Sequence, residues 1–275
     1  MSWQPEVDEL NRRLGMVQEM GGPEAVAKHK SRGKLTVRER IDILSDPGSF
    51  REGGTLTGTP EWDGNALKKL TPANSVTGHV HIEGRKAVVL GGDFTIRGGA
   101  ADGSIADKGA WALKQAYTNR IPFIRLLDAA GGSVRTFEKI GRTYLSTTDR
   151  TMEFDVLQRV PCVSAVLGSA AGLPAIYGVF CHFNVMVKGS SQLFAGGPPV
   201  VKASMGVDID KEALGGVDVH VKHSGVVANV AENEEDAFAQ IKRFLSYLPA
   251  NIWQMPPRTE PAPPPAADQE SLISF

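Results

Sequence analysis

The chain has 275 residues, of which 41% are hydrophobic and 22% charged, with 30 glycines and 17 prolines. This composition is ordinary for a globular protein with a sizeable core, built as one α/β domain or two small ones. The formal net charge of −1 argues against bulk nucleic-acid binding, which needs a strongly basic face. No apolar run approaches the roughly 20 residues of a membrane span, and the N-terminus lacks the pattern of a secretion signal. We therefore expect a cytoplasmic protein that binds neither nucleic acid nor membrane.

The N-terminal region predicts three helices. Residues 2–32 are polar and charged, and a Gly-Gly-Pro interruption divides them into two short surface helices. In the segment "TVRERIDIL", Thr36 and Glu39 have the spacing of a capping box. The apolar stripe of this third helix consists of Val37, Ile41 and Leu44.

The rest of the chain predicts a sheet covered by helices. Residues 52–75, rich in Gly, Thr and Pro, predict a loop, and residues 76–90 predict a β-hairpin. Continuous apolar strands alternating with helices then indicate a mainly parallel sheet that is buried on both faces, an α/β fold. The expected strands lie at 121–127, 160–167, 183–188 and 225–231, and the expected helices at 104–120, 137–158, 172–180 and 234–248.

Two glycine-rich segments follow successive apolar strands. One is "DAAGGSVR", Asp128 to Arg135, and the other is "GSAAGLPAIYG", Gly168 to Gly178. Adjacent glycines leave backbone N–H groups uncovered, and such groups can stabilise negative charge on a substrate oxygen. Glycine pairs at strand ends also make simple tight turns, and for either segment alone both interpretations stay open. Two such segments together favour oxyanion donors for a thioester carbonyl, in a site built from backbone dipoles rather than from a nucleophile.

Other catalytic motifs are absent or weak. The chain has no G-x-S-x-G and no P-loop, and the glycines from Gly91 to Gly99 do not fit a dinucleotide fingerprint. "SRGK", Ser31 to Lys34, matches S-x-x-K without its companion motifs, and we attribute it to chance. The basic run from Lys28 to Arg40 is interpreted as a solvated face. The alternative is a contact with the phosphates of a nucleotide-tailed substrate.

Cysteine and histidine do not form a metal-binding pattern. No CxxC pair or histidine cluster has zinc-ligand spacing, so we predict no metal site. Cys162 and Cys181 fall on or near expected buried strands and are interpreted as core thiols. Structural roles are also favoured for His79, His81 and His182. His182 follows the second glycine-rich segment and is the histidine that we would test as a general base.

At these residues the chain resembles the carboxyltransferase subunit of biotin-dependent acyl-CoA carboxylases, of the propionyl-CoA carboxylase β-subunit type. The resemblance covers residues 8–255 and corresponds to the N-terminal half of that family. It rests on many segments in the same order: "GKLTVRERIDILSDPGSF", "VVLGGDFTIRGG", "DAAGGSVR", "GSAAGLPAIYG", "VMVKGSSQLFAGGPPVVK", "EALGGVDVH", "SGVVANVAENEEDAF" and "RFLSYLP".

The resemblance implies a crotonase (ClpP-like) β-β-α superhelix with a helical N-terminal extension. We expect residues 1–50 to form the N-terminal helical segment and residues 51–255 the crotonase-like domain. Residues 256–275 would be a proline-rich linker or tail toward a C-terminal half that lies outside this chain.

The resemblance also implies a site that binds acyl-CoA. The backbone amides of Gly131 and Gly132 would form the oxyanion hole that holds the enolate oxygen. The CoA-binding residues would be Asp93, Phe94, Thr95, Gly98, Gly99, Ala130, Ser133, Gly168, Ala170, Ala171 and Gly172. Departures from the family pattern gather here: "DSGGAR" is replaced by "DAAGGSVR", with an extra residue and a lost serine, and Arg97 stands before Gly98-Gly99 in place of an aromatic residue.

The implied reaction moves a carboxylate from carboxybiotin to the α-carbon of an acyl-CoA. Carboxybiotin would release CO₂ and the biotin anion would take the α-proton, so no side-chain base is required. Biotin would be carried on a partner protein. The implied partners are a C-terminal half or subunit, biotin carboxylase and biotin carboxyl carrier protein, in a homo- or hetero-oligomer of the hexamer type. The alternatives are a subunit of a biotin-dependent decarboxylase, a non-catalytic scaffold, and a free-standing crotonase-type hydrolase or isomerase.

Overall fold

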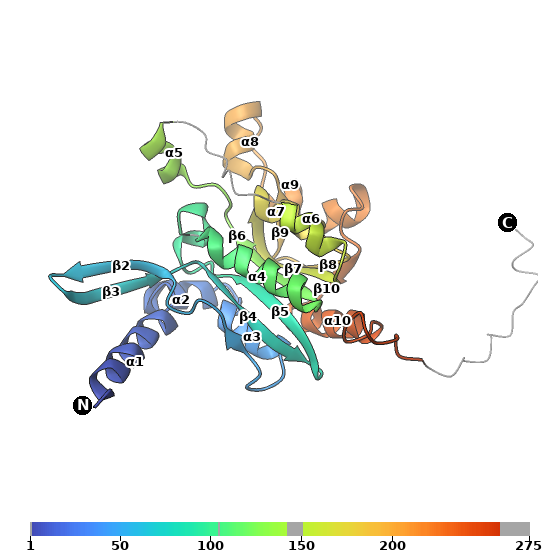
Figure 1. The fold of residues 1–275 in the computed structure, drawn as a ribbon. Helices are drawn as coiled ribbons and strands as arrows, with labels where there is room; N and C mark the ends of the chain where they lie inside the picture. Colours follow the sequence, from blue (N-terminus) through green and yellow to red (C-terminus); the bar gives the residue numbers. More distant parts are fainter. Residues whose placement is uncertain (1, 104, 142–150, 259–275) are drawn as a thin grey trace, which may run out of the picture.

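The computed structural model describes residues 2–103, 105–141 and 151–258. Its centre is a sheet in the order β1-β4-β5-β6-β7-β8-β10, with β9 paired to β7 (Figure 1). The pairs β1–β4 and β4–β5 are antiparallel, and all the later pairs are parallel, as expected for this part of the chain. The strands are β1 (Arg51–Glu52), β4 (Ser75–Ile82), β5 (Arg85–Gly92), β6 (Phe123–Ala129), β7 (Cys162–Ala171), β8 (Phe183–Val187), β9 (Gln192–Phe194) and β10 (Asn229–Ala231).

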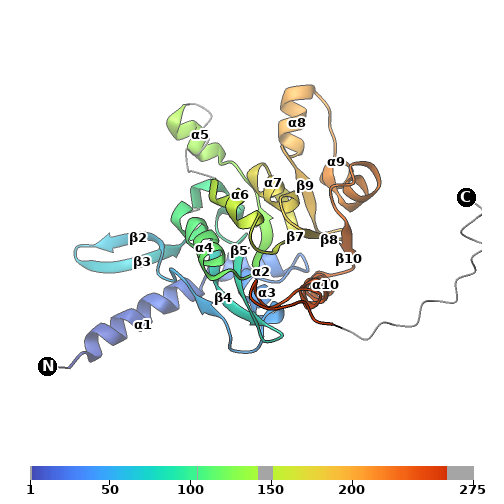
Figure 2. The ribbon, with the colours of Figure 1, turned by 45° about the vertical axis from the view of Figure 1, so that its right-hand side comes forward.

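Helices cover both faces of this sheet (Figure 2). Successive residues of a strand point to opposite faces, so in β6 Ile124 and Leu126 join one hydrophobic cluster while Phe123 joins another. The first cluster packs against α3 (Val37–Leu44) and α10 (Glu234–Ser246), and the second against α4 (Ala106–Asn119) and α6 (Thr151–Leu157). A third cluster lies under α7 (Leu173–Val179).

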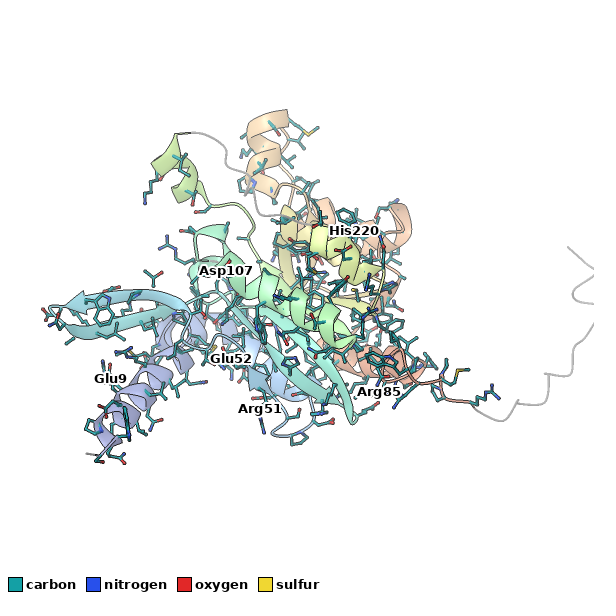
Figure 3. The ribbon with its side chains drawn as sticks, viewed as in Figure 1. Glu9, Arg51, Glu52, Arg85, Asp107 and His220 are labelled. Carbon is teal, nitrogen blue, oxygen red and sulfur yellow. The ribbon has the colours of Figure 1, made fainter. Side chains whose placement is uncertain are left out.

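The N-terminal helices form as predicted. α1 (Gln4–Gln18) and α2 (Pro23–Lys30) precede α3, whose capping box is complete. The Thr36 hydroxyl accepts a hydrogen bond from the Glu39 backbone N–H, and the Glu39 carboxylate accepts one from the Thr36 N–H. The predicted stripe of α3 is fully buried. Arg85, the first residue of β5 (Figure 3), donates hydrogen bonds to the carbonyls of Leu245 and Leu248 at the end of α10.

The prediction of a loop over residues 52–75 is wrong. This segment contains a second hairpin, β2 (Gly58–Asp63) and β3 (Ala66–Pro72), which stands off to one side of the main sheet together with α1 (Figure 1). Only Leu67 and Leu70 of this hairpin are buried hydrophobics, and they pack with Val17 of α1. A hairpin that buries so few apolar side chains carries little of the alternating pattern by which strands are predicted.

Three other boundaries differ from the sequence prediction. β7 continues to Ala171, so the first residues of the second glycine-rich segment belong to the strand and not to a loop. The expected helix over 137–158 is represented by α5 (Val134–Ile140) and α6, and residues 142–150 lie outside the described residues, as do 259–275 of the expected tail. The strand expected over 225–231 is restricted to β10.

The remaining short elements follow the main strands. They are η1 (Arg97–Gly99) and η2 (Ala101–Gly103) after β5, and α8 (Pro198–Met205), α9 (Lys211–Gly215) and η3 (Val219–His223) after β9. Across the described ranges, no helix combines the length and the apolar character that a bilayer crossing requires.

Candidate functional site

Three glycine-containing segments meet at the carboxyl ends of β5, β6 and β7. Parallel strands present their carboxyl ends at one edge of a sheet, where ligands of open α/β sheets bind. The Ala130 N–H donates a hydrogen bond to the Gly98 carbonyl over 2.9 Å, and the Ala101 N–H donates one to the Gly131 carbonyl over 2.8 Å. The segment after β5 is thereby bound to the segment after β6.

Gly131 lies where the chain has no room for a side chain. Its φ of +79° is in the left-handed region, and a Cβ would lie 2.3 Å from the Ala171 carbonyl oxygen. Gly99 has a φ of +66°, and its Cβ would lie 2.7 Å from the Ala129 Cα. Glycine is required at both positions because a Cβ would overlap neighbouring backbone atoms, and the left-handed conformation strains most other residues. The ends of β6 and β7 and the segment after β5 therefore touch through bare backbone.

Gly132 differs from its neighbour. Gly131 is buried, whereas Gly132 and Ala130 are exposed. Apart from Gly132 and its two chain neighbours, no described atom lies within 4 Å of the position that a Cβ would take at Gly132, and its φ is outside the left-handed region. A ligand can approach the backbone of Gly132 from this open side.

The side chains of Asp93 and Thr95 stabilise the segment after β5. Asp93 is 2% exposed, and its carboxylate accepts hydrogen bonds from the Thr95 N–H and hydroxyl over 2.9 and 2.5 Å. Burial raises the pKa of Asp93. The Thr95 hydroxyl also accepts a hydrogen bond from the Gly21 N–H, which ties the segment to the turn between α1 and α2. The Phe94 ring points toward Gly98, 3.8 Å from where a Cβ would be, and lies 5.6 Å from the Lys34 ammonium.

The structure brings only some of the predicted CoA-binding residues together at the sheet edge. Gly168 and Ala170 lie inside β7 and are buried, and Ala170, which pairs with Ala129, belongs to a hydrophobic core cluster. The Ser133 hydroxyl accepts a weak hydrogen bond of 3.3 Å from the Thr136 N–H at the start of α5. The residues that the structure brings together at the sheet edge are Phe94, Gly98, Gly99, Ala130, Gly131, Ala171 and Gly172.

A buried cluster of four charged side chains lies directly behind this edge, and we call it the ion cluster: Lys34, Arg40, Asp128 and Glu234. The Arg40 guanidinium donates to Asp128 over 3.2 Å and to both carboxylate oxygens of Glu234 over 2.7 Å. The Lys34 ammonium lies 3.2 Å from the Asp128 carboxylate. Burial lowers the pKa of Lys34, opposed by the charge of Asp128. Two cations and two anions make the cluster neutral, which is the condition for burying such charges.

The interpretation of the basic run as a solvated face is wrong for its C-terminal part. Arg40 is 1% exposed, and Lys30 and Arg38 pair with Glu39 and Glu52. The sequence carries a signal for this, because Arg40 follows Val37 by three residues and precedes Leu44 by four, which places it on the apolar stripe of α3. The four paired residues of the run, Lys30, Lys34, Arg38 and Arg40, meet protein carboxylates, which weakens the interpretation of the run as a phosphate contact.

His182 lies away from the glycine-containing segments. Its Nδ1 accepts a hydrogen bond of 3.0 Å from the Cys162 N–H at the first residue of β7, the end opposite to Ala171. Burial lowers the pKa of His182 and raises the pKa of the Cys162 thiol to about 12. The structure thus gives no support to His182 as a general base at this site. Within the described residues, no group of three or more His, Cys, Asp or Glu side chains has the arrangement of a metal site.

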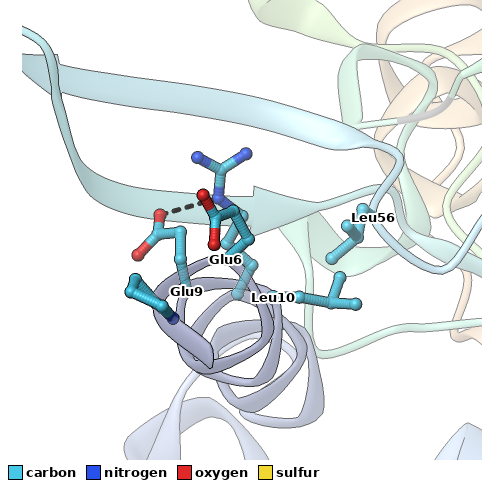
Figure 4. A pocket seen from close by; sticks show the side chains of 6 residues that line it. Glu6, Glu9, Leu10 and Leu56 are labelled. Atoms are coloured by element: carbon cyan, nitrogen blue, oxygen red, sulfur yellow. Dashed lines mark hydrogen bonds and ion pairs between the residues drawn. The ribbon is translucent and has the colours of Figure 1, made fainter. Parts of the chain in front are cut away.

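A surface pocket of about 350 Å³ lies elsewhere, between α1 and the segment before β2 (Figure 4). Glu9 lies at the rim of this pocket. Hydrogen bonds from Arg12, the larger effect, and from Arg13 lower the pKa of Glu9 to about 2. The lining residues are Pro5, Glu6, Glu9, Leu10, Arg13 and Leu56. None of them belongs to the glycine-containing segments.

Comparison with known proteins identifies the family to which this arrangement corresponds. Residues 28–275 match the family model of the carboxyl transferase domain. A propionyl-CoA carboxylase carboxyltransferase subunit of Haloferax mediterranei is 32% identical over 266 residues, covering 95% of this chain and 50% of the relative. A methylmalonyl-CoA decarboxylase subunit alpha of Veillonella parvula is 30% identical, covering 99% of this chain and 53% of the relative.

A solved structure of transcarboxylase 12S, with methylmalonyl-coenzyme A and methylmalonic acid bound, superposes with a TM-score of 0.79. Its sequence is 29% identical, and the match covers 95% of this chain and 51% of the other. The expected crotonase-like fold is thereby confirmed. The chain spans about half the length of the curated relatives that it matches.

Proposed function

The chain belongs to the carboxyl transferase domain family, and from this we propose that it is the acyl-CoA-binding half of a biotin-dependent carboxyltransferase. The proposal rests mainly on the packing of Gly131. Gly131 packs against the Ala171 carbonyl and is hydrogen-bonded to the segment after β5, while one side of the Gly132 backbone stays accessible to a ligand. Among the described residues, the immediate surroundings of Gly131 at this edge are backbone and small side chains, which suits a site for a thioester oxygen.

In the proposed reaction the thioester oxygen of an acyl-CoA accepts hydrogen bonds from the amides of Gly131 and Gly132. Loss of the α-proton places negative charge on this oxygen, and fixed amide dipoles stabilise that charge without reorganising. Carboxybiotin, when bound, supplies the carboxyl group and the base. The chain itself orients the thioester and holds its enolate, which agrees with the position of His182 at the opposite end of β7.

Phe94, Gly98, Gly99, Ala130, Ala171 and Gly172 are proposed to line the acyl-CoA site, with Ser133 at its rim. We leave Gly168 and Ala170 out of direct contact because they are buried inside β7. Asp93 and Thr95 are assigned to holding the segment after β5, since their polar atoms bond to each other and to Gly21.

The proposed partners are those that the family resemblance implies. Relatives of about twice this length suggest that a second half or subunit completes the site and receives biotin from a carrier protein loaded by biotin carboxylase. Transcarboxylase 12S forms a hexamer assembly, and we propose an oligomer of that kind here. The cytoplasmic location stays a prediction.

A second candidate is the α-subunit role in a biotin-dependent decarboxylase, which uses the same enolate in the reverse direction. The similarity to the Veillonella parvula subunit favours it. Recovery of the chain's natural partners separates the two: a biotin carboxylase is expected for a carboxylase, and a membrane subunit for a decarboxylase.

Transfer of labelled carboxylate from malonyl-CoA or methylmalonyl-CoA to free biotin tests the proposal. The assay combines this chain with the protein that supplies its second half. We expect transfer only when both are present, and loss of transfer in Gly132→Val. A scaffold would bind no acyl-CoA by calorimetry, and a hydrolase would release free thiol without biotin; either result contradicts the proposal.

A further inference from the structure

β7 changes its partner strand at the level of Asp128. Residues 163–166 of β7 pair with β8, and residues 169–171 pair with β9. On the other side, Leu127 pairs with Val166, and the next pair is Ala129 with Ala170. Asp128 alone therefore faces three residues of β7, at 167–169. Such a bulge bends a strand and redirects the residues beyond it.

The ion cluster fills the space opened by this bulge. Arg40 donates a hydrogen bond of 3.2 Å to the Leu167 carbonyl, a group inside the bulge. A Cβ on Gly168 would lie 2.0 Å from the Asp128 carboxylate and 2.4 Å from the Lys34 ammonium. The Asp128 side chain is fully buried and forms ion pairs with both Lys34 and Arg40. The charged groups thus occupy the place of a side chain at position 168.

The segment that carries the Gly131–Gly132 amides begins immediately after the bulge. Gly131 follows Asp128 by three positions, and Ala171, whose carbonyl packs against Gly131, follows Gly168 by three positions. The Asp128 carbonyl oxygen also contacts the segment after β5, because it would lie 2.8 Å from a Cβ on Gly99. A change in the bulge would therefore shift the two ends of the proposed site relative to one another.

We propose that the Asp128–Arg40 pair is a positioning device that sets the register between the ends of β6 and β7, and so aims the Gly131–Gly132 amides. The inference rests on the proposed function for its consequence, since the amides matter only if an acyl oxygen binds there. Asp128 and Arg40 act through the backbone and touch no substrate.

The test uses Asp128→Asn, which keeps the shape of the side chain and removes its charge. The matched control is Glu52→Gln. Glu52, on β1 (Figure 3), is a largely buried carboxylate that also pairs with two cations, Arg38 at 3.0 Å and Lys108 at 3.5 Å. Both variants leave buried cations without one anionic partner, so both are expected to lower the melting temperature.

Two measurements are made on each full-length variant. The first is the infrared C=O stretch of ¹³C-labelled propionyl-CoA, which moves to lower frequency when an oxyanion hole polarises the thioester. The second, free of ligand, is hydrogen exchange at the amides of Ala101 and Ala130, which bond to Gly131 and Gly98. We expect Asp128→Asn to lose most of the infrared shift and to speed both exchanges, while Glu52→Gln keeps the wild-type values. With the second half present, kcat should fall about 100-fold, with KM little changed.

The outcomes separate the two proposals. Absence of an infrared shift in the wild type contradicts the proposed function, while exchange still reports on the positioning role. Wild-type exchange and shift in Asp128→Asn, or equal losses in Glu52→Gln, overturn the positioning role. If Asp128→Asn does not fold, Arg40→Lys is used. It keeps the charge but cannot reach Asp128, Glu234 and the Leu167 carbonyl together, so the same two losses are expected.

Discussion

Gly131 and Gly132 are adjacent in the chain and have opposite surroundings. Gly131 is needed for the fold, because its φ and its contact with the Ala171 carbonyl exclude any side chain. Gly132 has room for one, so the fold does not account for glycine at that position. The proposed function does, since a side chain at Gly132 would cover the amide that a substrate oxygen approaches.

Substitutions at the two glycines should therefore separate stability from activity. Gly132→Val is expected to keep the wild-type melting temperature and to lower carboxyl transfer by about 10²- to 10³-fold, the usual cost of losing an oxyanion donor. Gly131→Ala should lower the free energy of unfolding by at least about 1 kcal/mol, from its left-handed conformation alone. Thermal denaturation and the transfer assay measure the two effects.

The control for this experiment is Gly15→Val. Gly15 lies on α1 and is exposed, and apart from its neighbours in the helix no described atom lies within 4 Å of the position that a Cβ would take. It should change carboxyl transfer little. Full transfer by Gly132→Val would remove the main reason for placing the thioester oxygen at this pair.

Local elements with strong signals are predictable from the sequence. The capping box and apolar stripe of α3 are visible in nine residues, and the apolar runs of β6 and β7 mark a buried parallel sheet. The β2–β3 hairpin is not predictable, because Leu67 and Leu70 are its only buried members of the hydrophobic core clusters and leave no alternating apolar pattern. The extension of β7 to Ala171 is also not predictable, because "GSAA" has the composition of a turn. Its pairing with β9 depends on residues more than 20 positions away.

The cap of α3 is expected to contribute measurably to stability. Thr36→Ala removes the side-chain acceptor for the Glu39 N–H, and we expect the free energy of unfolding to fall by about 1 kcal/mol. Thr36→Ser keeps the hydroxyl, and its free energy of unfolding should fall by less. Denaturant titration of both variants measures this, and equal losses would assign the effect to the buried methyl group instead of the cap.

At the scale of the molecule, the site depends on segments far apart in the sequence. The ion cluster joins α3 and its preceding turn to β6 and to the first residue of α10, across 194 positions between Arg40 and Glu234. The partners in these pairings cannot be predicted from local periodicity, although the place of Arg40 on the apolar stripe of α3 does indicate that its side chain is buried. The glycine pair is predictable as a candidate because its chemistry lies in the backbone. The way Gly131 packs against Ala171 requires the folded chain.

The central claim is that a thioester oxygen binds at the Gly131–Gly132 amides. Calorimetric titration of the chain with propionyl-CoA and with S-propyl-CoA tests it most directly, because the two ligands differ only in the thioester carbonyl. Two hydrogen bonds of about 0.5–1.5 kcal/mol each predict that the thioester binds roughly tenfold more tightly. Equal affinities for the two ligands, or binding of neither, would contradict the account.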